Sequence, residues 1–288
     1  MIKKQKVKIN LQEQVVAFRS GNFLELTTAG NTVNVVKKID KDHYINLATN
    51  EVKEYIHNNE RVGDLKSLQR TFTKIRRIVL SNFGSGDMWL TLTYAQDNHK
   101  PVRDTKKVYR DFQKFWRRFK TKYGPDVDYF VVLEPQASGS WHLHCLIKTS
   151  SGRLPFISNN EVIYPMWEQG FTKLKRLKNS DNVAAYLTAY LSNVAVNVEG
   201  ADGNKEKRIV KGARLHYYPS GTNIYRRSRG IKDPIRLKGS KAEILQVNNL
   251  PLDAEADFSK YEKYQNNGHN FSYKIEFFNN VNGDEEGK

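Results

Sequence analysis

Residues 128–148 read DYFVVLEPQASGSWHLHCLIK. Two runs whose side chains alternate between two faces, 128–134 and 141–148, flank the loop PQASGS. A loop that contains Gly between two such runs is typical of a β-hairpin. We therefore predict a pair of antiparallel strands here, and the rest of the domain is interpreted from this hairpin outward.

Strands and helices alternate on both sides of this hairpin. The run 88–94, MWLTLTY, alternates strictly, and 104–122 has an apolar stripe at helical spacing formed by Val108, Phe112, Phe115 and Phe119. The same patterns predict helices at 64–83, 161–168 and 180–194 and a strand at 171–177. The order β-α-β-β-α-β-α predicts an α+β fold in which helices pack on a sheet.

Composition divides the chain into three expected regions. Residues 1–63 are interpreted as a β-rich region of short strands and turns, and 64–238 as the domain that carries the candidate site. Within that domain, 198–212 is polar and contains Gly, which favours a mobile loop. Residues 239–288 are interpreted as an acidic, partly disordered tail, because 253–288 hold eight Asp/Glu and only four Lys, although 271–278 can dock as a strand.

The charge balance points to a polyanionic partner. The formal net charge is +16 and the sequence pI is about 9.7, which favours nucleic acid first and an acidic membrane second. No apolar run approaches the roughly 20 residues of a spanning helix, and the start, MIKKQKVKIN, lacks an apolar signal core. The lone Cys145 excludes an internal disulfide. We expect a cytoplasmic protein without membrane attachment.

The strongest chemical signal is the histidine pair in the second strand of the hairpin. Side chains alternate along a strand, so His142 and His144 should point to the same face, about 7 Å apart. If the hairpin pairs, Glu134 can lie on that face as well. Two imidazoles and a carboxylate predict a catalytic site for one Mn²⁺ or Mg²⁺ ion, with Gln136 either assisting or serving only as a loop residue. The alternative is a pair of structural, half-exposed histidines.

A second signal is a pair of tyrosines in the predicted helix 180–194. Tyr186 and Tyr190 are four residues apart and therefore share one helix face, while Val183 and Leu187 belong to an adjacent stripe that should face the core. A tyrosine that attacks phosphorus retains the energy of the broken phosphodiester in a reversible covalent bond. The alternative is that both tyrosines are packing residues.

Taken together, these motifs resemble those of the HUH endonucleases, in particular the rolling-circle replication initiators of bacterial plasmids, phages and mobile elements. The resemblance rests on 91–94 (TLTY), on 134–144 (EPQASGSWHLH) and on 183–190 (VAAYLTAY), and extends over roughly residues 65–236. It implies a five-stranded antiparallel sheet that carries the histidines, and nicking of an origin hairpin that leaves a 5′-phosphotyrosine and a free 3′-hydroxyl. Tyr186 is the expected nucleophile, with Tyr190 as its partner or alternate.

One departure from the family pattern concerns the lysine that often follows the nucleophile by three residues. This chain has Ala189 and Asn193 at those places, so another cation such as Lys173 or Lys175 is expected to replace it. No phosphate loop of the form GxxxxGK[ST] is present, so strand separation should depend on a separate host helicase and polymerase. The residues expected to contact DNA are Trp141, Gln136, Thr93, Lys173, Lys175, Arg226, Arg227 and Arg229.

Two interpretations compete with a replication initiator. A transposase or relaxase of the same superfamily would use the same chemistry, but the motif order disfavours relaxases that carry the tyrosine near the N-terminus. A non-catalytic basic DNA-binding regulator would explain the charge, with the histidines and tyrosines as structural residues. For the stacking of an unpaired base, we consider Trp141 or another exposed aromatic near the site, with core packing as the alternative for Trp141.

Overall fold

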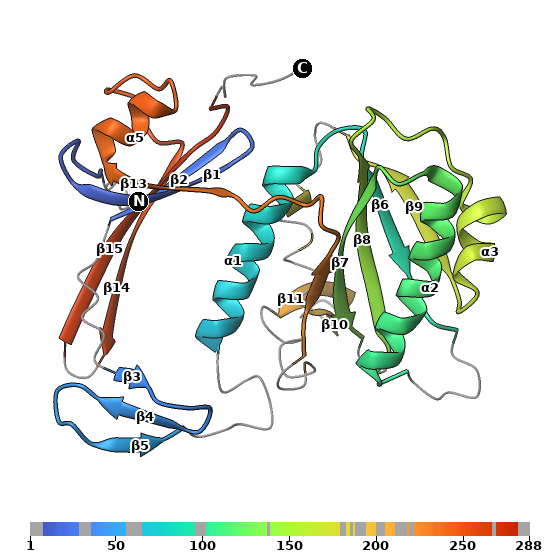
Figure 1. The fold of residues 1–288 in the computed structure, drawn as a ribbon, viewed down its shortest axis with the longest axis horizontal. Helices are drawn as coiled ribbons and strands as arrows, with labels where there is room; N and C mark the ends of the chain where they lie inside the picture. Colours follow the sequence, from blue (N-terminus) through green and yellow to red (C-terminus); the bar gives the residue numbers. More distant parts are fainter. Residues whose placement is uncertain are drawn as a thin grey trace. The chain divides into compact units, whose positions relative to one another are not determined.

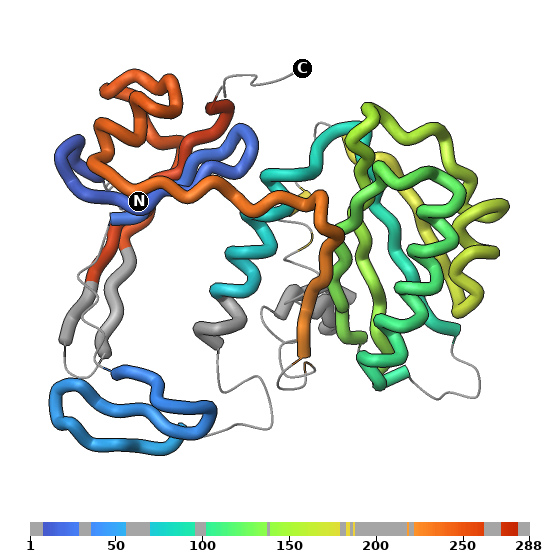
Figure 2. Tube along the Cα trace, viewed as in Figure 1, coloured from blue at the N-terminus to red at the C-terminus, as the bar shows by residue number. Residues whose placement is uncertain are grey.

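The computed structural model describes residues 8–28, 36–55, 65–95, 102–136, 139–178, 183–184, 187, 194–199, 205–210, 218, 222–266 and 269–281. The chain forms two compact units (Figure 2). One comprises Met1–His57 together with Pro234–Lys288, and the other comprises Asn58–Asp233. None of the helices within the described ranges is long and apolar enough to span a bilayer.

The second unit is built on a five-stranded sheet (Figure 1). Its strand order is β12-β7-β8-β6-β9, and every pairing in it is antiparallel. The strands are β6 (Met88–Leu92), β7 (Val127–Pro135), β8 (Trp141–Thr149), β9 (Thr172–Arg176) and β12 (Tyr225–Arg227). The predicted α+β fold with a five-stranded antiparallel sheet is confirmed.

The helices of this unit lie close to their predicted positions. They are α1 (Leu65–Asn82), α2 (Thr105–Tyr123), and the short pair η3 (Asn159–Ile163) and α3 (Tyr164–Trp167). Asp104 caps α2, because its side chain accepts a hydrogen bond from the backbone N–H of Lys106, and the helix ends before Gly124. The predicted boundaries therefore differ from the observed ones by one or two residues for the two long helices.

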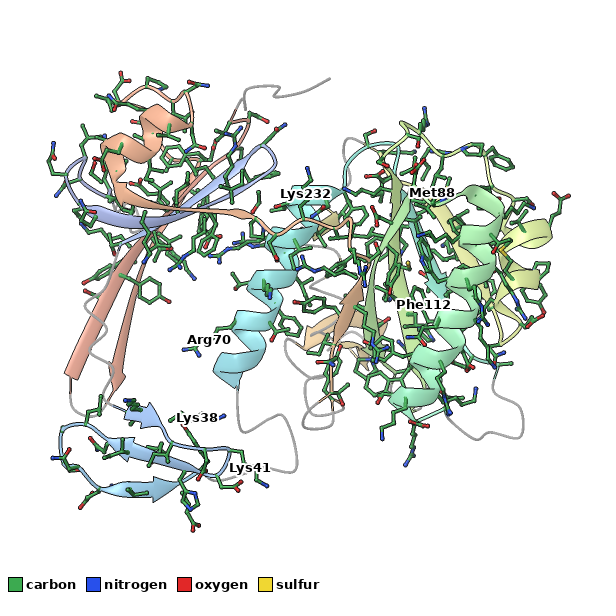
Figure 3. All side chains as sticks on the ribbon, viewed as in Figure 1. Lys38, Lys41, Arg70, Met88, Phe112 and Lys232 are labelled. Atoms are coloured by element: carbon green, nitrogen blue, oxygen red, sulfur yellow. The ribbon has the colours of Figure 1, made fainter. Side chains whose placement is uncertain are left out.

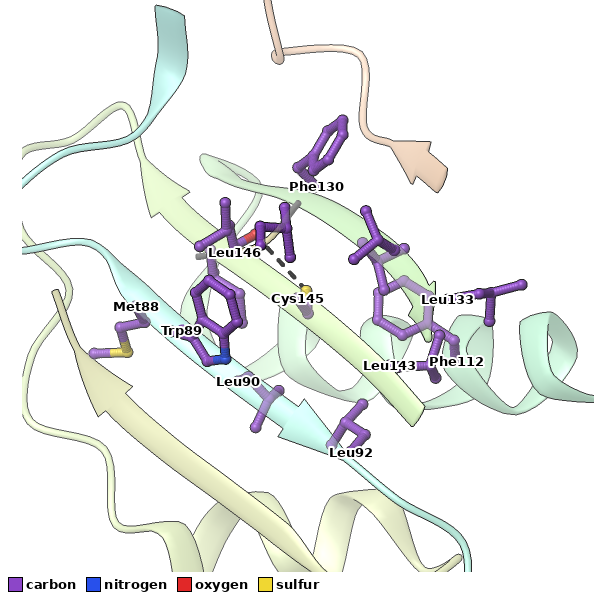
Figure 4. Close-up of a cluster of buried hydrophobic side chains, with 14 of the residues drawn as sticks. Met88, Trp89, Leu90, Leu92, Phe112, Phe130, Leu133, Leu143, Cys145 and Leu146 are labelled. Carbon is purple, nitrogen blue, oxygen red and sulfur yellow. Dashed lines mark hydrogen bonds between the residues drawn. The ribbon is translucent and has the colours of Figure 1, made fainter. Parts of the chain in front are cut away.

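Aromatic side chains join α2 to one face of the sheet (Figures 3 and 4). The predicted stripe of α2 is fully buried, and the Phe112 ring packs edge-on against Tyr129 with the ring centroids 5.0 Å apart. Phe115 contacts Trp167 of α3 in the same way, at 6.2 Å. Cys145, on β8, is buried in this core, and burial raises the pKa of its thiol well above the usual value. This thiol is therefore a packing group.

Two predictions in this unit have different outcomes. The expected loop at 198–212 is wrong, because β10 (Val194–Glu199) pairs with β11 (Lys205–Val210) as an antiparallel hairpin. The alternating valines of β10 carry the strand signal, but the polar sequence GADGN that follows obscured it. Of the predicted helix 180–194, the described residues Val183, Ala184 and Leu187 are helical and buried.

The first unit contains a second five-stranded sheet, with strand order β13-β1-β2-β15-β14. Its strands are β1 (Gln14–Ser20), β2 (Phe23–Thr28), β13 (Ile235–Ser240), β14 (Phe258–Asn266) and β15 (His269–Phe278), and the helix α5 (Lys241–Val247) follows β13. A separate three-stranded sheet contains β3 (Val36–Lys38), β4 (His43–Asn46) and β5 (Val52–Glu54). The expected β-rich N-terminal region is thus present.

The acidic C-terminal segment differs from the expected separate tail. Strand β15 pairs with β2, and β13 pairs with β1, so both ends of the chain build one sheet. The possibility that 271–278 docks as a strand is confirmed. Lys241 and Glu276, both buried, form an ion pair of 2.7 Å between Nζ and Oε2, and Lys241 Nζ also donates to the backbone oxygen of Ile9. Net charge alone could not reveal this pairing, because the strands carry their acidic residues between apolar ones.

Candidate metal and nucleic-acid site

The three candidate metal ligands lie together on one face of the central sheet. Glu134 on β7 is directly opposite His142 on β8, so the two side chains share a face, and His144 follows two residues later. The carboxylate oxygen Oε2 of Glu134 lies 2.6 Å from Nε2 of His144 and 3.8 Å from Nδ1 of His142. The hairpin register therefore brings these residues together across ten residues of chain.

A second hydrogen bond orients the His144 ring from strand β6. Thr91 is opposite His144, and its Oγ1 lies 3.2 Å from Nδ1 of the ring. The indole N–H of Trp89 donates to the same Thr91 oxygen at 3.2 Å. When Nε2–H of a neutral His144 donates to Glu134, Nδ1 accepts from the Thr91 hydroxyl, and both ring nitrogens are paired. Sequence reasoning missed Thr91 and Trp89 as parts of the site, although the strict alternation of 88–94 puts both on one face.

Burial sets the protonation of the imidazoles. The His144 side chain is 6% exposed and the His142 side chain 30%. Burial lowers the pKa of His144 to about 4, and burial together with the neighbouring His144 lowers the pKa of His142 to about 4. Both rings are neutral near pH 7, which is the form of histidine that binds a metal ion.

The donor set fits one divalent ion by its chemistry. Two neutral imidazoles and a buried carboxylate are ligands that Mn²⁺ and other first-row ions accept. Within the described ranges, however, no three His, Cys, Asp or Glu side chains are already arranged as a set of metal ligands. The reason lies in the 2.6 Å hydrogen bond between Glu134 and His144, since neighbouring ligands of an octahedral ion lie about 3 Å apart. An ion that took both atoms as ligands would have to replace this hydrogen bond.

The two candidate nucleophiles, Tyr186 and Tyr190, lie outside the described residues. Val183 and Leu187 of the predicted core-facing stripe are described, and both are helical and buried in the core of the second unit. This is the local structure on which the expected tyrosine helix depends.

Trp141, expected to contact DNA, is buried. Its side chain lies in the core at 3% exposure, the indole N–H donates to the backbone oxygen of Arg103, and the ring packs against Tyr218. The stacking role proposed for Trp141 is therefore wrong, and the alternative, core packing, describes it. Gln136 is half-buried in the hairpin turn, where its backbone N–H donates to Ser140 and its carbonyl accepts from Gly139.

Two of the expected DNA-binding lysines lie on β9, beside the histidine-bearing strands. Lys173 is exposed and pairs with Thr91, which also pairs with His144. The ammonium group of Lys175 lies 5.5 Å from the centroid of the Trp89 ring, a cation–π contact. The hydroxyl of Thr93, another expected contact, donates to the backbone oxygen of Phe171 at 2.9 Å.

The three arginines after β11 have different environments. Arg226 stacks on Tyr109 of α2 with its Cζ 3.7 Å from the ring centroid, which puts it on the α2 face of the sheet and away from the histidines. Arg227 pairs with Asp233 at 2.7 Å, and Arg229 is exposed. An expected DNA contact of Arg226 beside the histidine pair is therefore not supported.

Comparison with known proteins gives one match. Residues 87–195 match a family model for replication-associated proteins of the ORF2 type. No curated protein and no solved structure matches the chain. The matched segment begins just before β6 and includes Glu134, the histidine pair and both candidate tyrosines. The match suggests that this chain is a replication initiator.

Proposed function

We propose that this protein starts rolling-circle replication by nicking and rejoining single-stranded origin DNA, as the HUH endonucleases that its motifs resemble do. Tyr186 is the proposed nucleophile, with Tyr190 as its partner, and Glu134, His142 and His144 are the proposed ligands of one Mn²⁺ or Mg²⁺ ion. The products are a 5′-phosphotyrosine on the protein and a free 3′-hydroxyl on the DNA.

The observation that carries the proposal is the convergence of Glu134, His142 and His144. A carboxylate that is 2% exposed lies within hydrogen-bonding distance of one neutral imidazole and close to a second. Buried polar groups of this kind cost stability unless they are fully paired, and perturbed histidine pKa values gather at functional sites. The match to a replication-associated family over 87–195 supports the same interpretation.

The chemistry assigns a separate part to each group of residues. The phenol oxygen of Tyr186 forms a bond to phosphorus, the bond from phosphorus to the 3′-oxygen breaks, and the proton lost by the phenol is balanced by the one gained by the 3′-oxygen. A bound divalent ion would polarise the phosphate and stabilise the charge that develops on it. Glu134 and the Thr91 hydroxyl orient the His144 ring from its two nitrogens. Attack of a 3′-hydroxyl on the phosphotyrosine reverses the step and rejoins the strand.

The test is an end-labelling experiment with the full chain, Mn²⁺, and pools of randomised single strands and hairpins. A label at the 3′ end should become covalently attached to the protein, and a label at the 5′ end should appear in a shorter product that a polymerase can extend. Tyr186→Phe should abolish both signals, whereas Tyr190→Phe should retain nicking. Absence of an adduct in the wild type, or an adduct that persists when both tyrosines are replaced, would overturn the proposal.

A further inference from the structure

We propose that Phe171 stacks an unpaired base of the DNA strand beside the histidine pair, and that Lys173 and Lys175 contact the adjacent phosphates. The inference deepens the proposed function, on which it rests, by assigning the surface that receives the single strand. It replaces the stacking role of Trp141, whose ring is buried.

The strand register brings Phe171 to the level of the histidines. Thr91 on β6 is opposite His144 on one side and opposite Lys173 on the other. Strands β8 and β9 therefore run in the same direction on either side of β6, and Phe171, two residues before Lys173, is level with His142. Two strand spacings, or roughly 10 Å, separate the two positions.

Phe171 also lies on the face of the sheet that carries the histidines. Directly paired residues on neighbouring strands share a face, and the contact between Thr91 Oγ1 and Nδ1 of His144 confirms this for the central pair. Lys173, paired with Thr91, is on the same face, and residues two and four positions apart on a strand alternate back to it. Phe171, Lys173 and Lys175 thus form one row along the outermost strand of the sheet.

The Phe171 ring is exposed, although its backbone is held firmly. The side chain is 63% exposed, whereas the backbone oxygen accepts hydrogen bonds from both the N–H and the hydroxyl of Thr93, each at 2.9 Å. Gly170 lies so close to Thr93, Tyr94 and Ala95 that a Cβ atom there would overlap their backbone atoms. A ring on a fixed backbone loses little conformational entropy when a base stacks on it.

The charges along the row match a single nucleic-acid strand. Cations at alternate positions of β9 follow the aromatic ring, and single-strand binding surfaces combine such cations with aromatic side chains on which bases stack. One exposed apolar side chain is ordinary on a protein surface. This one stands out because it shares a row with two lysines and a level with the proposed metal ligands.

The test measures binding of fluorescent single strands by the full chain at several salt concentrations. Phe171→Ala should weaken binding on the order of 5- to 100-fold without changing the slope of log K against log salt, and Phe171→Tyr should restore it. Lys173→Ala should instead reduce that slope by about 0.7. Phe156→Ala is the matched control: Phe156 is 88% exposed but follows β8 near Arg176, at the other end of β9, and its loss should not matter.

Strands with an abasic site provide a second readout. Scanning such sites along the strand should reveal a position at which the wild type binds less tightly and Phe171→Ala shows no further loss. The inference is overturned if Phe171→Ala binds like the wild type, or if its effect lies only in the salt slope. Either result would leave the proposed function intact as long as the covalent adduct still forms, and loss of the adduct in Tyr186→Phe tests that function separately.

Discussion

The Nε2 atom of His144 lies 2.6 Å from Oε2 of Glu134, and both side chains are almost completely buried. The two groups satisfy each other, because a neutral imidazole donates and a carboxylate accepts. Such a pair is an expensive device in a sheet core, which apolar residues could fill at less cost. Its retention agrees with a role in chemistry, and the contact gives several experiments a defined starting point.

Replacing Glu134 should separate the effect of its hydrogen bond from that of its charge. Glu134→Ala leaves the buried Nε2–H of His144 without its acceptor and should lower the free energy of unfolding by about 1–3 kcal/mol. Glu134→Gln keeps an acceptor of the same size and should lower it less, but it removes a charged metal ligand. Equilibrium urea unfolding checks both variants, and equal losses would show that the hydrogen bond contributes little.

Metal binding should be visible as a change in thermal stability. At an Mn²⁺ concentration of about 100 times the dissociation constant, the wild type should melt about 5–10 °C higher. His142→Ala/His144→Ala should show no such increase, and Glu134→Gln a reduced one. His43→Ala serves as the control, because His43 lies on β4 of the other unit and pairs with Asp40. A shift that survives in the double histidine variant would place the ion elsewhere.

The lowered histidine pKa values predict how stability depends on pH. In the unfolded chain each imidazole should titrate near the ordinary value of 6.5, and in the folded chain near 4. Between these values the unfolded state holds more protons, so the free energy of unfolding should fall as pH decreases from about 6.5 to 4 and lose this contribution's pH dependence below that.

Replacing the histidines isolates this contribution from other titrating groups. Each removed histidine should reduce the slope of unfolding free energy against pH by up to about 1.4 kcal/mol per pH unit within that window. Urea titrations of His142→Asn, His144→Gln and the wild type at a series of pH values measure the difference. Identical slopes in all three proteins would contradict the buried, neutral state of these rings.

The close approach at Gly170 makes a different prediction. A methyl group there would meet the backbone of Thr93, Tyr94 and Ala95, so Gly170→Ala should lower the free energy of unfolding by about 1–3 kcal/mol and displace Phe171. Gly84 has no atom within 4 Å of the same position, so Gly84→Ala is a matched control that should be nearly neutral. Single-strand binding measured on both variants should weaken only for Gly170→Ala.

Sequence patterns identified the parts of the fold whose signals are local. The hairpin loop and the alternation of 128–148 predicted β7 and β8, and the aromatic stripe predicted α2 with the cap at Asp104. The hairpin register also led to the proximity of Glu134 to the histidines, since it follows from pairing across one short loop. These features depend on neighbours close in sequence, where periodicity and turn chemistry are informative.

Long-range pairing could not be inferred in the same way. The partnership of β15 with β2 joins residues about 250 positions apart, and no local pattern in the acidic segment encodes it. The burial of Trp141 has the same origin, because Arg103 and Tyr218 cover it from distant segments. Phe171 escaped notice in the sequence because its importance comes from being level with His142 across an intervening strand.

The central claim is that Tyr186 becomes covalently linked to DNA in a reaction that needs the histidine pair. Peptide mass spectrometry of the protein after incubation with Mn²⁺ and single-stranded DNA tests it most directly. We predict a nucleotide attached through a 5′-phosphate to the peptide that contains Tyr186, and no such peptide from His142→Ala/His144→Ala. A nucleotide on a different residue, an unmodified protein, or the same yield without the histidines would contradict the account.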